Sequence, residues 1–281
     1  MRFDAHQHFW RYRPETHPWI SDAMPQLKRD FLPADLRPLL AAAGFDGCIA
    51  VQAQHSLAET EWLLQLADAH PFIRGVIGWV DLCAPNVLDD LQRLTCQPRL
   101  RGMRHIVQDE PDERFLLRPD FVRGIALLRQ LGLTYDLLIY PRHLPAAVDL
   151  VRCLPDQSFV VDHIAKPEIR ARRVDDWQRG IRALAAAPNV CCKLSGLVTE
   201  ADWQRWQAAD FAAYLDIVLE AFGPQRLMIG SDWPVCTLAA CYADAIRVVT
   251  DYIGRLSVDE QDAVLGGVAA CWYHLPPPVR S

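Results

Sequence analysis

The feature that most constrains this chain is a pair of histidines, His6 and His8, within its first apolar segment. The pattern over residues 3–9 predicts a β-strand, in which side chains alternate faces, so Asp4, His6 and His8 are expected to point the same way. Two imidazoles about 7 Å apart on one face can converge on one metal ion or one substrate. Such pairs also occur by chance, so the motif needs a second signal.

That second signal lies near the other end of the chain. The sequence M-I-G-S-D-W-P at residues 228–234 reads as an apolar strand that stops at an acid, Asp232. A His-x-His strand at the start and a strand ending in an aspartate near the finish favour an enzymatic barrel over other folds of this length.

Apolar strand patterns alternate with helical patterns along all 281 residues. The predicted strands are 3–9, 47–52, 73–80, 100–105, 133–139, 159–163, 190–195 and 227–231. Eight strand–helix units predict a closed (β/α)8 TIM barrel, and no linker-like segment interrupts them, so one domain is expected over 1–281. The alternative, an open doubly wound sheet, lacks a G-x-G-x-x-G motif after an early strand.

Local signals set several helix ends. A capping box is predicted at Ser56–Glu59, the last helix should begin at Ser257–Glu260, and Gly223 should close a helix over 208–222. Pro38 lies inside a helix expected over 33–43 and should kink or restart it.

Composition excludes several functional classes. The net charge is −6 without a basic stripe, which argues against binding of nucleic acid. No apolar run approaches the ~20 residues of a membrane span, and a strand starting near residue 2 leaves no room for a signal peptide, so a cytoplasmic protein is expected. Nine cysteines without a C-x-x-C pair are expected to be reduced and mostly buried.

Polar residues gather where the predicted strands end, which is where barrel enzymes carry their chemistry. His6, His8, His163 and Asp232 are the candidate catalytic and metal-binding residues, because they come from three strands that open onto one mouth. Each also has a plain structural reading, such as an imidazole that satisfies a backbone carbonyl or an aspartate that caps a helix. The candidate substrate-binding residues are Arg104, His105, Tyr140 and Trp233.

Several motifs resemble the amidohydrolase superfamily, and within it the amidohydrolase 2 group of sugar-lactone hydrolases such as L-fuconolactonases and L-rhamnonolactonases. They are D-x-H-x-H-F-W at 4–10, R-G-x-R-H at 101–105, D-H-x-x-K-P at 162–167, K-L-S-G-L at 193–197 and G-S-D-W-P-V at 230–235. The resemblance spans nearly the whole chain and implies a (β/α)8 barrel that hydrolyses a cyclic ester.

The sequence departs from the two-metal pattern of that superfamily, which needs a carboxylated lysine on strand four. Arg104 stands there, so at most one divalent cation is expected, most simply zinc on His6, His8, His163 and Asp232. A reaction without metal stays open. Strand five offers no clear ligand unless Asp136 or His143 turns inward.

The resulting hypothesis is hydrolysis of a sugar (aldono) lactone to the sugar acid. Asp232 would act as general base, the three histidines would polarise the carbonyl, and Lys166 would support the site by pairing with Asp162. No G-x-S-x-G elbow supports a covalent acyl-enzyme. The alternatives are a zinc-dependent decarboxylase and a non-catalytic sugar-binding barrel. The expected partner is a small-molecule lactone, and a homo-oligomer stays open.

Overall fold

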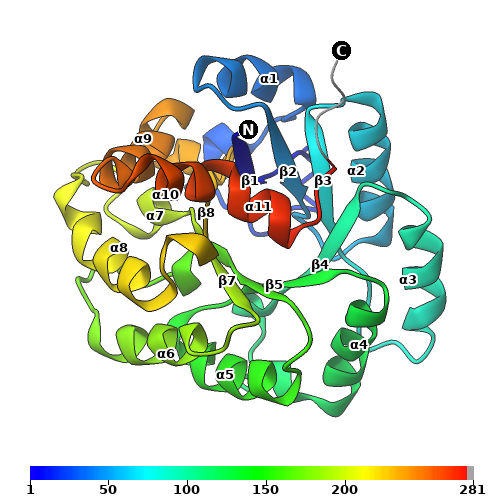
Figure 1. The fold of residues 1–281 in the computed structure, drawn as a ribbon. Coiled ribbons are helices and arrows are strands. Elements are labelled where there is room, and N and C mark those ends of the chain that lie inside the picture. Colours follow the sequence, from blue (N-terminus) through cyan, green and yellow to red (C-terminus); the bar gives the residue numbers. More distant parts are fainter. Residues whose placement is uncertain (277–281) are drawn as a thin grey trace.

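Eight parallel strands form one sheet in sequence order in this computed structural model, which describes residues 1–276 (Figure 1). The strands are β1 (Phe3–Gln7), β2 (Gly47–Val51), β3 (Ile73–Gly78), β4 (Leu100–Ile106), β5 (Thr134–Leu138), β6 (Phe159–Val161), β7 (Val190–Leu194) and β8 (Leu227–Ile229). All eight predicted strands are confirmed. Most end before the predicted boundary, because the polar residues that follow them already belong to loops.

Main-chain hydrogen bonds between the first and last strands close the sheet into a barrel. Asp232 donates its backbone N–H to the carbonyl of His6 at 2.8 Å, and His8 donates its own to the carbonyl of Trp233 at 2.7 Å. Gln7 also forms a parallel bridge with Trp233. This β1–β8 seam confirms the predicted (β/α)8 barrel and joins the two ends of the chain at the same edge.

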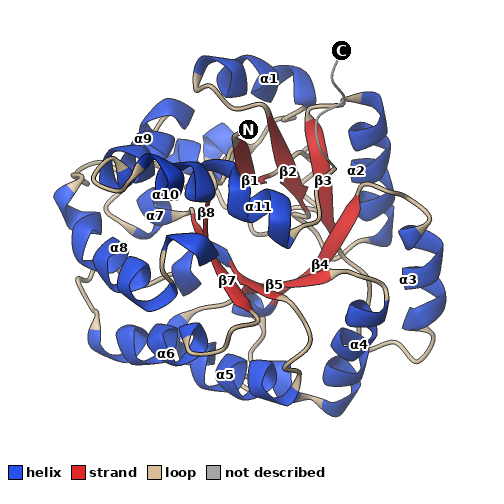
Figure 2. Ribbon diagram, viewed as in Figure 1, coloured by secondary structure: helices blue, strands red, loops and turns tan. Residues whose placement is uncertain are grey.

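Helices surround the strands, as the two colours of Figure 2 show. They are α1 (Pro33–Ala42), α2 (Leu57–Ala69), α3 (Val87–Thr95), α4 (Pro119–Gln130), α5 (Leu144–Cys153), α6 (Asp175–Ala185), α7 (Leu197–Glu200), α8 (Ala209–Phe222), α9 (Tyr242–Ile253), α10 (Val258–Asp262) and α11 (Val268–Trp272). The predicted stop of α8 is confirmed, since Gly223 follows it with a φ of +68°.

The predicted capping box at the start of α2 forms only in part. Ser56 Oγ accepts a hydrogen bond from the N–H of Glu59 at 3.2 Å. The Glu59 carboxylate does not return to Ser56 but accepts from the N–H groups of Ala53 and Gln54. Glu59 therefore holds the loop after β2, which the sequence pattern did not show.

Two other helix predictions need correction. α1 continues through Pro38 as one helix, so it does not restart there. The capping box of Ser257 and Glu260 is complete, but the helix it starts ends at Asp262. A π-helical segment over residues 263–267 separates it from α11, so the predicted last helix is divided.

The barrel has an inner core distinct from the layer between strands and helices. Phe3, Ile49, Val160 and Met228 pack inside the barrel, and Tyr273, which follows α11, packs against them. α11 lies across the front of the barrel in Figure 1, over the amino ends of the strands. The opposite end is left open for the strand-end residues.

Asp4 does not share a face with His6, contrary to the alternation expected for this strand. The pairing of β1 with β2 shifts register between Asp4 and Gln7, which breaks the alternation. Asp4 turns outward and accepts hydrogen bonds from Ser231 Oγ at 2.6 Å and Tyr242 Oη at 3.1 Å. His6 turns into the barrel.

Within residues 1–276, none of the helices has the length and apolar character needed to cross a lipid bilayer. The prediction of one domain over 1–281 extends past the described part of the chain at residues 277–281.

Candidate active site

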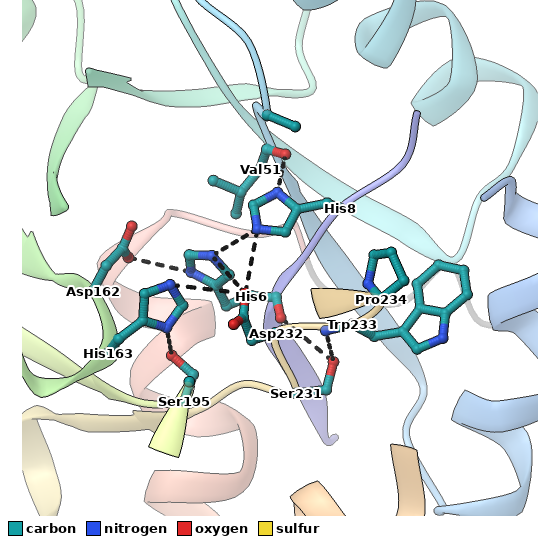
Figure 3. Close-up of polar contacts among 12 residues, drawn as sticks. His6, His8, Val51, Asp162, His163, Ser195, Ser231, Asp232, Trp233 and Pro234 are labelled. Atoms are coloured by element: carbon teal, nitrogen blue, oxygen red, sulfur yellow. Dashed lines mark hydrogen bonds and ion pairs between the residues drawn. The ribbon is translucent and has the colours of Figure 1, made fainter. Parts of the chain in front are cut away.

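Four of the predicted residues lie together at the carboxyl ends of β1, β6 and β8 (Figure 3). Asp232 Oδ1 is 3.4 Å from His8 Nε2 and 3.8 Å from the Nε2 atoms of both His6 and His163. All four side chains are buried. Three strands distant in sequence therefore direct three imidazoles and one carboxylate at a single point.

The hydrogen bonds of the outer ring nitrogens orient these imidazoles. His8 Nδ1 lies 2.8 Å from the carbonyl oxygen of Val51, which can only accept, so Nδ1 carries a proton and Nε2 faces Asp232. His163 Nδ1 lies 2.9 Å from Ser195 Oγ. Contacts of this kind fix the ring orientation and the basicity of histidines that bind metals.

The arrangement fits one divalent cation. The ligand atoms of His6, His8 and Asp232 all lie within 4.8 Å of one another, and the two histidine Nε2 atoms are 3.2 Å apart. A tetrahedral zinc ion with bonds of about 2.0–2.1 Å separates its ligand atoms by about 3.3–3.4 Å.

Arg104 takes the strand-four position and leaves no place for a second cation beside the first. Its Nη1 donates to Asp162 Oδ2 at 2.9 Å and lies 3.3 Å from His6 Nε2, while Nη2 donates to the carbonyl of Gln52. A second set of possible metal ligands, formed by His6, Asp162 and His163, also has closely spaced ligand atoms. Its carboxylate is already paired with cationic side chains, so the site near Asp232 is the better metal site.

Beneath His6 lies a buried charge network that the sequence did not reveal. Lys193 Nζ is 2.6 Å from Asp136 Oδ2 and 2.9 Å from Asp162 Oδ1, and Tyr273 Oη donates to Asp136 at 2.8 Å. Asp136 does turn inward, as considered from the sequence, but it binds Lys193. In the sequence, the signal for this network was a lysine in β7 and an aspartate in β5 at positions that point into the barrel.

The loop after β6 contains a left-handed turn. His163, Ile164, Ala165 and Lys166 have φ values of 53°, 48°, 59° and 47°. Each such residue costs about 1–2 kcal/mol relative to the right-handed conformation. Trp177 Nε1 stabilises the turn by donating to the carbonyl of Ile164 at 2.7 Å.

Gly196 makes room for His163. A Cβ atom at Gly196 would lie 2.5 Å from His163 Nδ1, and the residue has a φ of +63°. Only glycine meets both conditions without strain. This explains why the K-L-S-G-L motif places a glycine directly after Ser195, the hydrogen-bond partner of His163.

A cavity of about 360 Å³ opens above the cluster. Its polar wall includes the predicted residues Arg104 and Tyr140 as well as Lys166 and Glu200, and its apolar wall includes Trp19 and Trp203. The volume lies within the range of about 300–1,000 Å³ that is typical of small-molecule sites.

Two predicted substrate residues lie outside this cavity wall. His105 stacks between His55 and Phe115, with ring centroids 4.0 and 4.9 Å away, and its Nε2 is 2.7 Å from Glu110 Oε1. Trp233 packs edge-on against Phe31 in the outer core. The structure therefore gives both side chains packing partners in place of an exposed position in the cavity.

The predicted pairing of Lys166 with Asp162 is wrong. Lys166 Nζ lies 3.1 Å from Glu200 Oε1, whereas Asp162 is paired with Arg104 and Lys193. The left-handed turn is the physical reason, because it carries Lys166 from the barrel interior into the cavity wall.

The protonation states suit base catalysis near neutral pH. Burial by itself raises the pKa of Asp232, but His163 and His8 outweigh it and hold the pKa below its ordinary value. Burial lowers the pKa of His6 and of His163 well below the usual imidazole value. Asp232 is therefore ionised at neutral pH, and burial favours the neutral forms of His6 and His163.

Comparison with known proteins finds relatives that align over nearly the whole chain. The sequence profile of a family described as amidohydrolase matches residues 3–275. The chain is 45% identical to an L-fucono-1,5-lactonase of Burkholderia multivorans (strain ATCC 17616 / 249), over 99% of this chain and 97% of that protein. It is 37% identical to an L-fucono-1,5-lactonase of Burkholderia ambifaria (strain ATCC BAA-244 / DSM 16087 / CCUG 44356 / LMG 19182 / AMMD), over 99% and 97% of the two chains.

A solved structure gives the same result for the fold. An amidohydrolase from Burkholderia multivorans, crystallised with bound zinc, superimposes with a TM-score of 0.94 at 44% sequence identity. The match covers 98% of this chain and all of that one. That neighbour contains zinc, the same ion that the donor set of this chain would suit.

Proposed function

The chain belongs to the amidohydrolase family, and we propose that it hydrolyses the ring ester of a sugar lactone at the site formed by His6, His8, His163 and Asp232. One observation carries the proposal: an ionised carboxylate lies within 3.8 Å of three imidazole nitrogens at the floor of a small-molecule cavity. The two L-fucono-1,5-lactonases that align over nearly the whole chain support a hydroxylated lactone as the substrate.

His6, His8 and Asp232 would hold a divalent cation, with His163 beside it. When bound, such a cation polarises the lactone carbonyl and lowers the pKa of a water molecule.

Asp232 acts as the general base. Oδ1 faces the imidazoles, whereas Oδ2 has no hydrogen-bond or ion-pair partner within residues 1–276 and is left for proton transfer. It takes a proton from the attacking water and passes it to the ring oxygen as the C–O bond breaks, so that the base is regenerated with each turnover.

The charges of the cavity favour a neutral ring over one that carries a carboxylate. Both cationic side chains in the cavity wall are already paired, Arg104 with Asp162 and Lys166 with Glu200. A decarboxylase needs to hold an anionic substrate, and the carboxylate in each of these pairs offsets the positive charge that would attract one. The pairing thus supports the lactonase over the decarboxylase considered from the sequence.

A lactone panel tests the proposal. The purified protein is assayed with 1,4- and 1,5-lactones of deoxyhexonic and pentonic acids by acid release against a pH indicator, with the Asp232→Asn variant as blank. We expect release with at least one 1,5-lactone that the variant does not catalyse. Equal rates for protein and variant across the panel would refute lactone hydrolysis at this site.

A further inference from the structure

We propose that the ion pair of Lys166 and Glu200 binds hydroxyl groups of the substrate ring and sets the preference of the enzyme for polyhydroxylated lactones. The inference rests on the proposed lactonase function and extends it to the residues that select the ring. Lys166 Nζ and Glu200 Oε1 are 3.1 Å apart in the cavity wall, with side chains 15% and 19% exposed.

The pair keeps unused hydrogen-bonding capacity. An ammonium group has three N–H donors and a carboxylate has about four acceptor positions, and this contact uses one of each. Within residues 1–276 neither charged group has another hydrogen-bond or ion-pair partner. A ring hydroxyl both donates and accepts, so two neighbouring hydroxyls can bind Lys166 and Glu200 together.

The backbone holds Lys166 in this place at an energetic cost. Lys166 ends the left-handed turn that begins with His163, and its N–H donates to the carbonyl of His163 at 2.8 Å. The same turn therefore places one side chain at the reacting centre and another beside the ring. An ion pair with only a stabilising role does not need four unfavourable backbone conformations.

Neighbouring contacts fix both partners. Lys166 Nζ lies 5.7 Å from the centroid of the Tyr140 ring, within the range of a cation–π contact. Glu200 ends α7, and Trp203 Nε1 donates to the carbonyl of Thr199 at 2.8 Å, which ties the following segment to that helix. Trp203 also lines the cavity and offers an apolar surface for the C–H face of a ring.

Selectivity follows from the hydrogen-bonding capacity that this partly buried pair leaves unused. A site built to bind a hydroxyl rejects an analogue that lacks it, because its own polar groups are then left without partners. The pair should therefore favour a hydroxylated 1,5-lactone strongly over δ-valerolactone, the unsubstituted six-membered lactone.

The experiment compares kcat/KM for these two lactones in Lys166→Met and Glu200→Gln, which preserve side-chain length. Each variant should lose about 10- to 100-fold in kcat/KM for the hydroxylated lactone, since a hydrogen bond to a charged group is removed. The value for δ-valerolactone should stay within about threefold. Glu220→Gln is the matched control, because Glu220 pairs with Arg182 at 2.7 Å on the exposed surface.

Two results would overturn the proposal: equal losses for both lactones, or an unchanged preference in both variants. If the parent protein hydrolyses neither lactone, the proposed function fails instead. The pair is then tested by calorimetric binding of L-fucose, a hydroxylated six-membered ring. Weaker binding by both variants than by Glu220→Gln would support the pair as a hydroxyl-binding element, and equal affinity would refute it.

Discussion

Arg104 and Asp162 form an ion pair inside the barrel, with Nη1 and Oδ2 2.9 Å apart and both side chains no more than 3% exposed. Arg104 occupies the strand-four position next to His6, and Asp162 follows β6. A guanidinium there repels a second cation and uses the carboxylate that could have bound it. The first prediction follows from this contact.

We predict that the protein binds no more than one equivalent of divalent metal. Elemental analysis of protein purified without added metal, and again after dialysis against excess zinc, measures the stoichiometry. Removal of the metal by a chelator should lower activity, and one equivalent of zinc should restore it. Two tightly bound metals per chain would contradict the role assigned to Arg104.

Arg104→Met should destabilise the fold strongly. The change leaves Asp162 buried with one cationic partner fewer, and breaking a buried ion pair costs about 3–5 kcal/mol. Urea unfolding followed by circular dichroism measures the loss. Arg182→Met removes a partner of Glu220 at the surface and should cost at most about 1 kcal/mol. Similar losses in the two variants would show that Arg104 is not a structural cation.

Gly196→Ala should impair catalysis more than Gly132→Ala. Both glycines have positive φ, +63° and +68°, so both substitutions carry a similar backbone cost. A Cβ at Gly196 would lie 2.5 Å from His163 Nδ1, whereas nothing lies within 4 Å at Gly132. We expect kcat to fall at least about tenfold only in Gly196→Ala, because a displaced His163 disturbs the geometry around Asp232, and a misplacement of about 1 Å can cost about 10²-fold. Equal kcat values in the two variants would argue against a catalytic position for His163.

Asp232→Asn should nearly abolish turnover while ligand binding persists. The change is close to isosteric and removes the base, which is worth about 10²–10⁴ in rate. The parent should show an acid limb in its pH–rate profile below the ordinary carboxylate range, because the pKa of Asp232 is lowered. Asp216→Asn, at an exposed site, is the control. A variant that keeps a tenth of the parental kcat and the same limb would transfer the role to an imidazole.

Glu59 should make stability fall as the pH rises. Burial raises its pKa from 4.5 to about 8, although backbone N–H donors oppose the shift. Between these values the unfolded chain releases a proton that the folded chain keeps. Stability is thus fully present below about pH 4.5 and is lost toward pH 8, by at most about 1.4 kcal/mol per pH unit. Glu59→Gln should remove this slope in urea titrations, whereas Glu61→Gln, half-exposed on the same helix, should keep it.

Periodicity was sufficient to predict the strands, because eight apolar segments separated by helices allow few other folds. It failed where local alternation meets a bulge: the register shift in β1 separates Asp4 from His6. The sequence pattern also predicted that the Glu59 side chain caps its own helix. A pattern of this kind does not show that the carboxylate can reach the backbone of the preceding loop.

The part of the candidate site that lies at the ends of strands could be predicted from the sequence. His6, His8, His163 and Asp232 follow strands that share an edge, and the structure brings them together. The partners of Lys166 and Lys193 could not be predicted. The partner of Lys166 depends on a left-handed turn without glycine, which has no sequence signature. The partner of Lys193 depends on depth inside the barrel, which strand alternation alone does not give.

The β1–β8 seam makes the site depend on segments that lie far apart in the chain. His6 and His8 precede Asp232 by more than 200 residues. A nascent chain released before that point holds the imidazoles without the base, and a chain whose seam has not closed holds the two on separate edges. Hydrolysis thus reports that the barrel has closed, and a chain that lacks Asp232 or an intact seam is expected to be inert.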